Sequence, residues 1–213
     1  MRNSFLLCAS AALAACNFAA TGSDAESQDD AAATPPTAAP SSPSAPGASQ
    51  AAELLTPTGW GPLSIGMDRA AIEQALGADV NPESIAGPDD TQCDQLDPAR
   101  APEGMLLMVE QDRLSRIELH DGSTVKTADG FGVGDRSSAI KQALGDRVQA
   151  SPHKYADAPA EYLTIWAGGK ATGPGGYVSD EAARGITYEI GTDGKVQSIF
   201  AGGPAIQYVE GCL

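Results

Sequence analysis

Apolar residues recur at helical spacing in two short stretches whose sequences match each other. Residues 63–77, LSIGMDRAAIEQALG, and residues 131–145, FGVGDRSSAIKQALG, align without a gap 68 positions apart. In each stretch an isoleucine, an alanine and a leucine fall on one helical face, and a glycine follows where a left-handed C-cap is needed. The pattern predicts two helices of about two turns. Their repetition predicts a duplicated unit.

The residues at the start of each expected helix include side chains that cap helices well. Asp68 is expected to cap the first helix, and Asp135 or Ser137 the second, because their side-chain oxygens accept bonds from free backbone amides. Helices this short are marginal on their own in water. Each of them therefore has to pack against something else.

Apolar and polar residues alternate in several segments that follow the helices. Segments 105–109 and 114–119 predict a hairpin, in which Arg116 and Glu118 point away from the apolar face. Segments 185–190 and 195–201 flank Asp193-Gly194, a strong hairpin signal. Two further segments, 162–166 and 205–210, complete an expected four-stranded sheet in the second half. The polar stretch 79–103 contains four prolines and predicts a long loop.

These elements predict an α+β fold made of two repeats, each a short helix packed on its own antiparallel sheet. The first repeat is expected at residues 53–122 and the second at residues 123–213. The first would have the smaller sheet. A helix followed by an antiparallel hairpin is a unit that can bury one face of each element.

The N-terminal residues 1–15 have the features of a secretory signal. Arg2 precedes an apolar run at 5–15, which is too short to cross a bilayer. The run ends in Leu-Ala-Ala-Cys, which resembles the lipobox of bacterial lipoproteins. This resemblance implies that Cys16 carries a diacylglyceryl group, with ordinary cleavage and a free Cys16 as the alternative. Since Asn17 follows the cysteine, the resemblance also implies placement in the outer membrane, with the folded part in the periplasm or at the cell surface.

Residues 16–52 follow as a linker rich in alanine, proline and serine, with almost nothing to bury. This composition predicts a disordered tether that reaches as much as about 100 Å from the membrane. The whole chain has a formal charge of −15. So acidic a protein is a poor partner for nucleic acid or for a lipid surface through basic side chains. The lipid anchor is thus the expected membrane contact.

Two cysteines remain once the signal and the lipid site are set aside. Cys93 and Cys212 form an even pair in a chain expected to be exported, which predicts a disulfide. The alternative is two free buried thiols. A disulfide between them would tie the penultimate residue back to the first repeat.

The first helical stretch carries a resemblance to a known family. Its pattern of apolar-x-apolar-Gly-Met, a capping residue and a helix closing in Leu-Gly resembles the SmpA/OmlA lipoproteins, small outer-membrane components of the barrel-assembly machinery. The residues that match are Leu63, Ile65, Gly66, Met67, Asp68, Ile72, Leu76 and Gly77, and more weakly Phe131, Val133, Gly134, Ile140, Leu144 and Gly145. The resemblance implies a helix-plus-sheet fold and a role in envelope assembly.

Two further resemblances extend this comparison. β-Lactamase inhibitory protein is similar in carrying two copies of a related unit, whereas the SmpA/OmlA proteins have one. Its aromatic-rich binding face has little counterpart in a chain that is 5% aromatic. The ending Tyr-Val-Glu-Gly-Cys resembles that of uncharacterised bacterial exported proteins.

Candidate catalytic and ligand-binding motifs are few. His120 and His153 are the two histidines, and no Gly-x-Ser-x-Gly motif accompanies them, so no catalytic residue is assigned. The acidic stretch 89–97 lacks the spacing of a calcium loop, and the glycine-rich stretch 168–176 lacks that of a phosphate loop. We expect a solvated loop and a mobile connection there. The sequence therefore predicts no cofactor and no metal site.

One strand has a pattern typical of a binding surface. Alternation in 162–166 directs Leu163 and Ile165 toward the helix, and Tyr162, Thr164 and Trp166 toward the other sheet face. Exposed aromatic side chains are common interface anchors. The alternative is that long loops or the other repeat cover them.

These patterns lead to three functional hypotheses. The leading one is a non-enzymatic lipoprotein that binds an envelope or secreted protein, or assists envelope assembly. The second is an inhibitor, or a module that sequesters a small ligand. The third is a hydrolase that uses His120 or His153.

Overall fold

The computed structural model describes residues 53–82, 92–171, 173 and 176–212. The expected signal peptide, the lipidated Cys16 and the linker all lie outside these residues. So do residues 89–91 of the acidic stretch and residues 172, 174 and 175 of the glycine-rich stretch. Within the described part of the chain, no helix combines the length and apolarity needed to cross a membrane.

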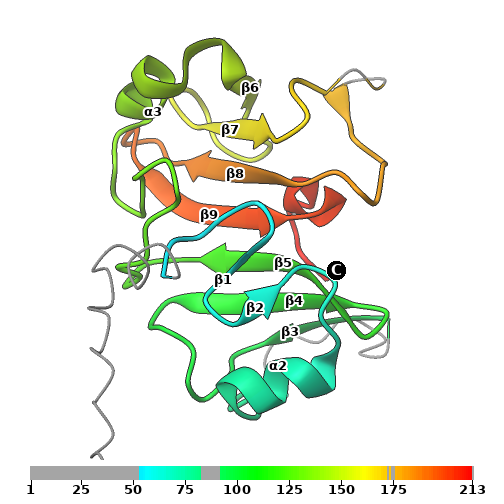
Figure 1. Cartoon of the computed structure of the whole chain (residues 1–213). Helices are drawn as coiled ribbons and strands as arrows, with labels where there is room; N and C mark the ends of the chain where they lie inside the picture. The colour runs from blue at the N-terminus through cyan, green and yellow to red at the C-terminus, as the bar shows by residue number, and fades with distance from the viewer. Residues whose placement is uncertain (1–52, 83–91, 172, 174–175, 213) are drawn as a thin grey trace, which may run out of the picture. The chain divides into compact units, whose positions relative to one another are not determined.

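The described residues form an α+β fold around one antiparallel sheet, as Figure 1 shows. Its seven strands run in the order β3-β4-β5-β9-β8-β7-β6, and β1 and β2 form a separate small ladder. The α-helices are α2 (Arg69–Leu76) and α3 (Ser137–Leu144), and two short 3-10 helices are η1 (Gly145–Arg147) and η3 (Pro204–Gln207). The strands are β1 (Gly59–Trp60), β2 (Leu63–Ser64), β3 (Cys93–Leu96), β4 (Met105–Glu110), β5 (Arg113–Leu119), β6 (Gln149–Pro152), β7 (Glu161–Trp166), β8 (Gly185–Ile190) and β9 (Val196–Gly202).

The predicted α+β class is confirmed, but a single sheet replaces the two that the sequence suggested. β5 and β9 pair antiparallel, from Arg116 opposite Gly202 to Leu119 opposite Ile199. This ladder joins the strands of the first half to those of the second. It pairs residues about 80 positions apart in the chain, so local sequence patterns could not reveal it.

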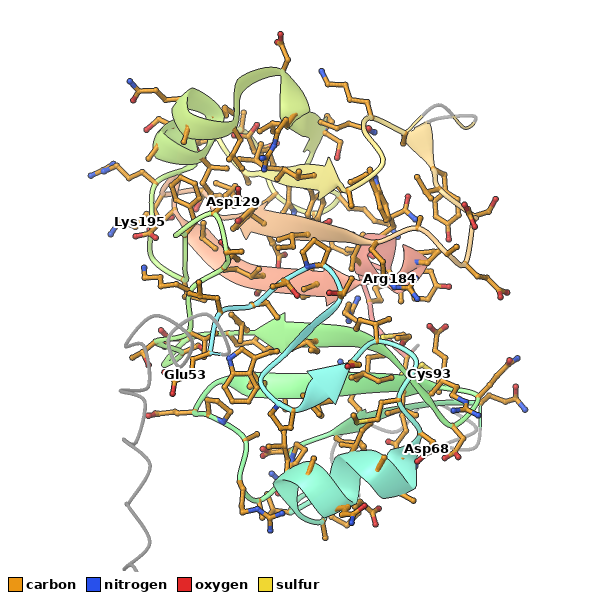
Figure 2. The ribbon with its side chains drawn as sticks, viewed as in Figure 1. Glu53, Asp68, Cys93, Asp129, Arg184 and Lys195 are labelled. Carbon is orange, nitrogen blue, oxygen red and sulfur yellow. A yellow bond between two sulfur atoms is a disulfide. The ribbon has the colours of Figure 1, made fainter. Side chains whose placement is uncertain are left out.

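Helix α2 begins and ends as its sequence predicts. Asp68 at its N-terminus (Figure 2) accepts a hydrogen bond from the Ala71 amide at 2.8 Å, and Gly77 takes a φ of 88° at the C-cap. The two side chains that α2 buries are Ile72 and Leu76. Its amphipathic pattern is therefore matched by the packing.

Helix α3 ends as expected at Gly145 but is not capped as expected. Its N-cap residue is Arg136, which makes no side-chain capping bond. The carboxylate of Asp135 is occupied elsewhere, since it accepts from the Gly132 amide at 2.8 Å and from Lys126 Nζ at 2.9 Å. Ser137 is the first helical residue rather than the cap. The prediction of Asp135 or Ser137 as the cap was therefore wrong.

The loop that leads into each helix docks on a strand of its own half. The Gly66 amide donates to the Leu114 carbonyl at 2.7 Å, and the Gly134 amide donates to the Val196 carbonyl at 2.8 Å. In both halves the strand residue donates back to the next loop residue, at 2.8 and 2.9 Å. Gly66 and Gly134 also share a φ near 90°, a conformation that favours glycine. The two matching sequence stretches thus have matching backbone contacts.

The main hydrophobic core lies between one face of the sheet and the two helices. Ile72 and Ile140 are fully buried there, and α2 and the β1–β2 segment cross the same face in Figure 1. The strands contribute alternate residues to this core, among them Leu107, Ile117, Leu163, Tyr188 and Ile199. The opposite face carries two smaller clusters, which η3 and the C-terminal segment cover in part.

Two predicted segments differ from the structure, and one strand was not predicted. Residues 205–210 form η3 and an irregular tail instead of a strand, because Pro204 lacks an amide and Arg116 binds the carbonyls of this segment. The predicted loop 79–103 contains β3, which pairs with β4 and buries Leu96. β6 was missed because its four residues, ending in Pro152, are largely exposed and show no alternation.

Candidate functional site

The residues predicted to form a binding face line one cavity. On β7, Leu163 and Ile165 face the helices, and Tyr162, Thr164 and Trp166 face the opposite side, so the predicted alternation is confirmed. These three side chains line a cavity of about 260 Å³. The remaining lining comes from β6, β8 and β9, from Lys154, and from segments 176–177 and 206–209.

Trp166 forms part of the floor of this cavity and is itself covered. Its exposed fraction is 7%, and it packs in a cluster with Phe200 and Ile206, which are also buried. The sequence left open whether other parts of the chain cover these side chains. For Trp166 they do, since a C-terminal segment lies over it. Tyr162 and Thr164 are only partly buried.

Exposed large hydrophobic side chains gather at the rim of the cavity. Among the described residues four such side chains are well exposed: Tyr155 (62%), Val80 (54%), Tyr177 (48%) and Val209 (39%). Tyr177 and Val209 line the cavity, and Tyr155 follows Lys154, another lining residue. Three of the four thus lie at or beside one concavity. We call Tyr155, Tyr177 and the aliphatic Val209 together the aromatic rim, after its two tyrosines.

Sequence reasoning missed the aromatic rim because its residues lie in loops without periodicity. The one signal available was compositional. The chain has five tyrosines, and Tyr162, Tyr177 and Tyr208 all line this cavity. Few aromatic residues are present, but folding brings several of them together.

Hydrogen bonds and a disulfide hold the C-terminal wall of the cavity. Cys93, labelled in Figure 2 at the start of β3, is bonded to Cys212, with their Cα atoms 5.4 Å apart, which confirms the predicted disulfide. Arg116 Nη1 donates to the carbonyls of Ala205 and Tyr208 at 3.0 and 2.8 Å. The segment between these attachments carries Tyr208 and part of the rim. The wall is therefore fixed before any ligand arrives.

A second set of bonds joins this wall to the facing loop. The side chain of Gln207 accepts from the Val178 amide at 2.9 Å and donates to the Val178 carbonyl at 2.8 Å. On the other side, Gln149 of β6 accepts from the Ala171 amide at 3.0 Å. The backbone around the cavity is thus bridged by side-chain amides.

Tyr162 is held by its neighbours, but its hydroxyl group has only a weak polar contact. Its ring stacks on that of His153 at 4.8 Å, and His153 Nε2 lies 2.9 Å from a Glu189 carboxylate oxygen. The Tyr162 hydroxyl is buried, and its contact with the Lys154 backbone lacks the geometry of an ordinary hydrogen bond. Burial and the Glu189 charge raise its pKa above 10.0, against the Lys154 backbone contact and the Lys154 charge, which lower it. The group therefore stays neutral at ordinary pH.

A buried polar network lies beside the cavity on the same sheet face. Arg116 and Glu118 form an ion pair with exposed fractions of 2% and 3% for their side chains. Glu118 also accepts from Gln95 Nε2 at 2.8 Å and lies 2.9 Å from His120 Nε2. Burial acts to raise the Glu118 pKa, but the His120 hydrogen bond and the Arg116 charge outweigh it and lower that pKa below 4.5.

His120 has a second polar partner in this network. Its Nδ1 lies 3.3 Å from the hydroxyl oxygen of Ser198 on β9. A serine, a histidine and a carboxylate therefore form a chain of contacts that the sequence did not reveal. His153 is bonded to Glu189 instead and has no part in this chain.

The remaining candidate stretches have structural partners where they are described. Asp94 pairs with Arg69 at 2.8 Å, and Asp97 accepts from the Asn81 side chain at 2.9 Å. Among the described residues no group of three histidine, cysteine or acidic side chains is placed to hold a metal ion. From the glycine-rich stretch, Gly176 lines the cavity.

Known proteins provide no further guide to this site. Comparisons with protein-family models, with curated proteins and with solved structures found no match. The candidate site is therefore argued from its own geometry.

Proposed function

We propose that this chain is an outer-membrane lipoprotein whose folded part binds another protein of the envelope, without enzymatic activity. The observation that carries the proposal is the gathering of the aromatic rim around one preformed cavity. Interfaces depend on a few aromatic anchors seated in desolvated pockets. Tyrosines also provide large contact areas at little cost in conformational entropy.

The fixed C-terminal wall supports binding over a structural role alone. Cys93–Cys212 and Arg116 hold the segment that carries Tyr208 and Val209. A surface that is already ordered loses less entropy when a partner binds. Stability of the fold alone does not require that Tyr177 and Val209 both be exposed at the same cavity.

Placement in the envelope rests on two features of the chain. The Leu-Ala-Ala-Cys sequence at residues 13–16 resembles a lipobox, so Cys16 is the proposed site of lipid attachment. The disulfide agrees with an oxidising compartment. Two or more acyl chains would give stable anchoring in a membrane.

We also propose that the two halves are tandem copies of one unit. The matching stretches 63–77 and 131–145 make equivalent bonds, with Gly66 and Gly134 donating to the strands that follow. Each half adds its own strands to the common sheet, and β5 and β9 meet at its centre. This arrangement agrees with the resemblance to the SmpA/OmlA lipoproteins and to the two-unit β-lactamase inhibitory protein.

Site-specific photo-crosslinking in cells tests the binding function. A photoreactive amino acid at Tyr177 should give a discrete adduct with one envelope protein, whereas the same amino acid at Val80 should not. Val80 is the matched control because it is equally exposed and does not line the cavity. Changing Cys16→Ser should abolish the Tyr177 adduct by releasing the protein from the membrane. Equal adduct patterns from both positions would overturn the proposal.

An inhibitor or sequestering module is the first alternative. The same cavity would then engage a secreted enzyme or a small molecule. Identification of the adduct by mass spectrometry separates this case, because an inhibitor should be crosslinked to a secreted enzyme rather than to an envelope component.

A hydrolase is the second alternative, and the contacts between Ser198, His120 and Glu118 favour it specifically. In such a site His120 would take the proton of the Ser198 hydroxyl, and Glu118 would orient the imidazole ring. A fluorophosphonate probe should then label the protein, and His120→Ala should prevent labelling while His153→Ala should not. Absence of labelling in the folded wild-type protein would exclude this serine mechanism.

A further inference from the structure

We infer that the cavity receives one uncharged aromatic side chain from the protein partner. This inference rests on the proposed binding function and names the chemistry of the anchor. Three properties of the cavity carry it: its size, the absence of carboxylates in its lining, and the aromatic groups that form it.

The volume of the cavity suits a single side chain. It encloses about 260 Å³. A cavity of roughly 150 Å³ is enough for benzene, and most pockets for small organic ligands exceed about 300 Å³. One aromatic side chain therefore fills this space, whereas a larger organic ligand would extend beyond it.

The lining disfavours a charged anchor. The chain carries 28 acidic residues, but among the residues that the structure describes none lines this cavity. Of the described lining residues Lys154 alone is charged, and its Nζ already lies 3.7 Å from a Glu210 carboxylate oxygen and 5.1 Å from the Tyr155 ring. A carboxylate from a partner would compete with Glu210 in a strongly acidic molecule. A cation would be attracted by the aromatic rings but would meet the like charge of Lys154, with no carboxylate among the described lining residues to offset the loss of hydration.

Aromatic residues make up five of the fifteen described residues that line the cavity. Trp166 and Phe200 pack together in a buried cluster, and Tyr162, Tyr177 and Tyr208 also line the space. Offset or edge-to-face ring pairs add to the attraction that burial alone provides. The Tyr162 hydroxyl is buried, so the attraction expected from this side chain is that of its ring.

The test uses amino-acid amides as probes of the cavity. The purified full chain, labelled with ¹⁵N and kept in detergent micelles, is titrated with N-acetyl-tryptophanamide, N-acetyl-leucinamide and N-acetyl-lysinamide. The indole resonance of Trp166 should shift with the aromatic probe, which should bind about fivefold more tightly than the leucine probe. The Trp60 indole, which donates to the Glu53 carbonyl at 2.7 Å, is the internal control.

A pair of neighbouring variants shows whether the probe enters the cavity. Ser151 is exposed on β6 and lines the cavity, whereas Ala150 is exposed beside it and does not. Ser151→Trp should fill the space and remove the Trp166 shift, and Ala150→Trp should leave it unchanged. Equal binding of all three probes, no shift at Trp166, or a shift that survives in Ser151→Trp would overturn the inference.

The probe titration and the crosslinking experiment can each give a negative result while the other is positive. If the probe binds as expected and Tyr177 gives no specific adduct, the aromatic cavity stands and the protein-binding function is overturned. If Tyr177 crosslinks to one envelope protein and no probe shifts Trp166, the function stands and the aromatic anchor is overturned.

Discussion

Replacing Arg116 with methionine is the sharpest test of the buried polar network. The substitution keeps an unbranched side chain but leaves the Glu118 carboxylate, 3% exposed, without its cation. Removing one partner of a buried pair costs about 3–5 kcal/mol. The carbonyls of Ala205 and Tyr208 also lose a donor. We therefore expect the free energy of unfolding to fall by about 4 kcal/mol near neutral pH.

The loss should depend on pH in a defined direction. In the wild type the Glu118 pKa is lowered, so its stabilising contribution is present above about pH 4.5 and disappears as the pH falls through the lowered value. Without Arg116 the contacts of Glu118 with His120 and Gln95 remain, but the loss of the guanidinium charge should raise the Glu118 pKa, and protonation should then relieve the buried charge. The difference between wild type and variant should therefore shrink as the pH falls.

Urea unfolding of the oxidised full chain, followed by far-ultraviolet circular dichroism, measures both effects. The double variant Arg116→Met, Glu118→Leu provides the control, because removing both charges should recover most of the stability. A difference below about 1 kcal/mol at neutral pH, or one of the same size at about pH 4, would refute the reasoning.

Four further predictions follow from individual contacts. Cys93→Ser should lower the free energy of unfolding by about 5 kcal/mol in the chain-entropy model, since the disulfide spans 119 residues; urea unfolding with and without reductant checks this. Asp68→Ala should cost about 1 kcal/mol through loss of the cap, whereas Arg136→Ala, which removes no capping bond, should cost almost nothing in the same assay. Burial raises the pKa of Tyr188 to about 12, further than the smaller upward shifts of Tyr162 and Tyr208, so in an absorbance titration the last tyrosine to ionise should be absent in Tyr188→Phe. Tyr162→Phe should leave the melting temperature almost unchanged, because its buried hydroxyl contacts the Lys154 backbone only weakly; a clear fall in the melting temperature would contradict this.

The elements that the sequence predicted correctly depend on neighbours in the chain. The ends of α2, the hairpin at Asp193-Gly194 and the alternation along β7 are local, since each is decided within about ten residues. The disulfide followed from counting the cysteines of a chain that the sequence predicts to be exported. Tyr162, Thr164 and Trp166 were identified from alternation alone, and all three line the cavity.

What the sequence did not reveal depends on remote partners. Arg116 and Glu118 alternate correctly on β5, and on that pattern alone they resemble solvent-facing residues. They are buried because η3, about 90 positions later, folds across them. Tyr177 and Val209 lie in irregular segments, so nothing in their local sequence links them to β7. Long-range contacts of this kind have no periodic signature.

The ladder between β5 and β9 means that the central part of the sheet forms late during synthesis of the chain. β5 (Arg113–Leu119) ends 77 residues before β9 (Val196–Gly202) begins, so the central strand waits for most of the second half to emerge. Until then the first half exposes an open strand edge, which is a template for self-association. A chain truncated after residue 122 would keep that edge permanently. The protein therefore needs β9, near the end of its sequence, to cover the edge of β5 and prevent aggregation.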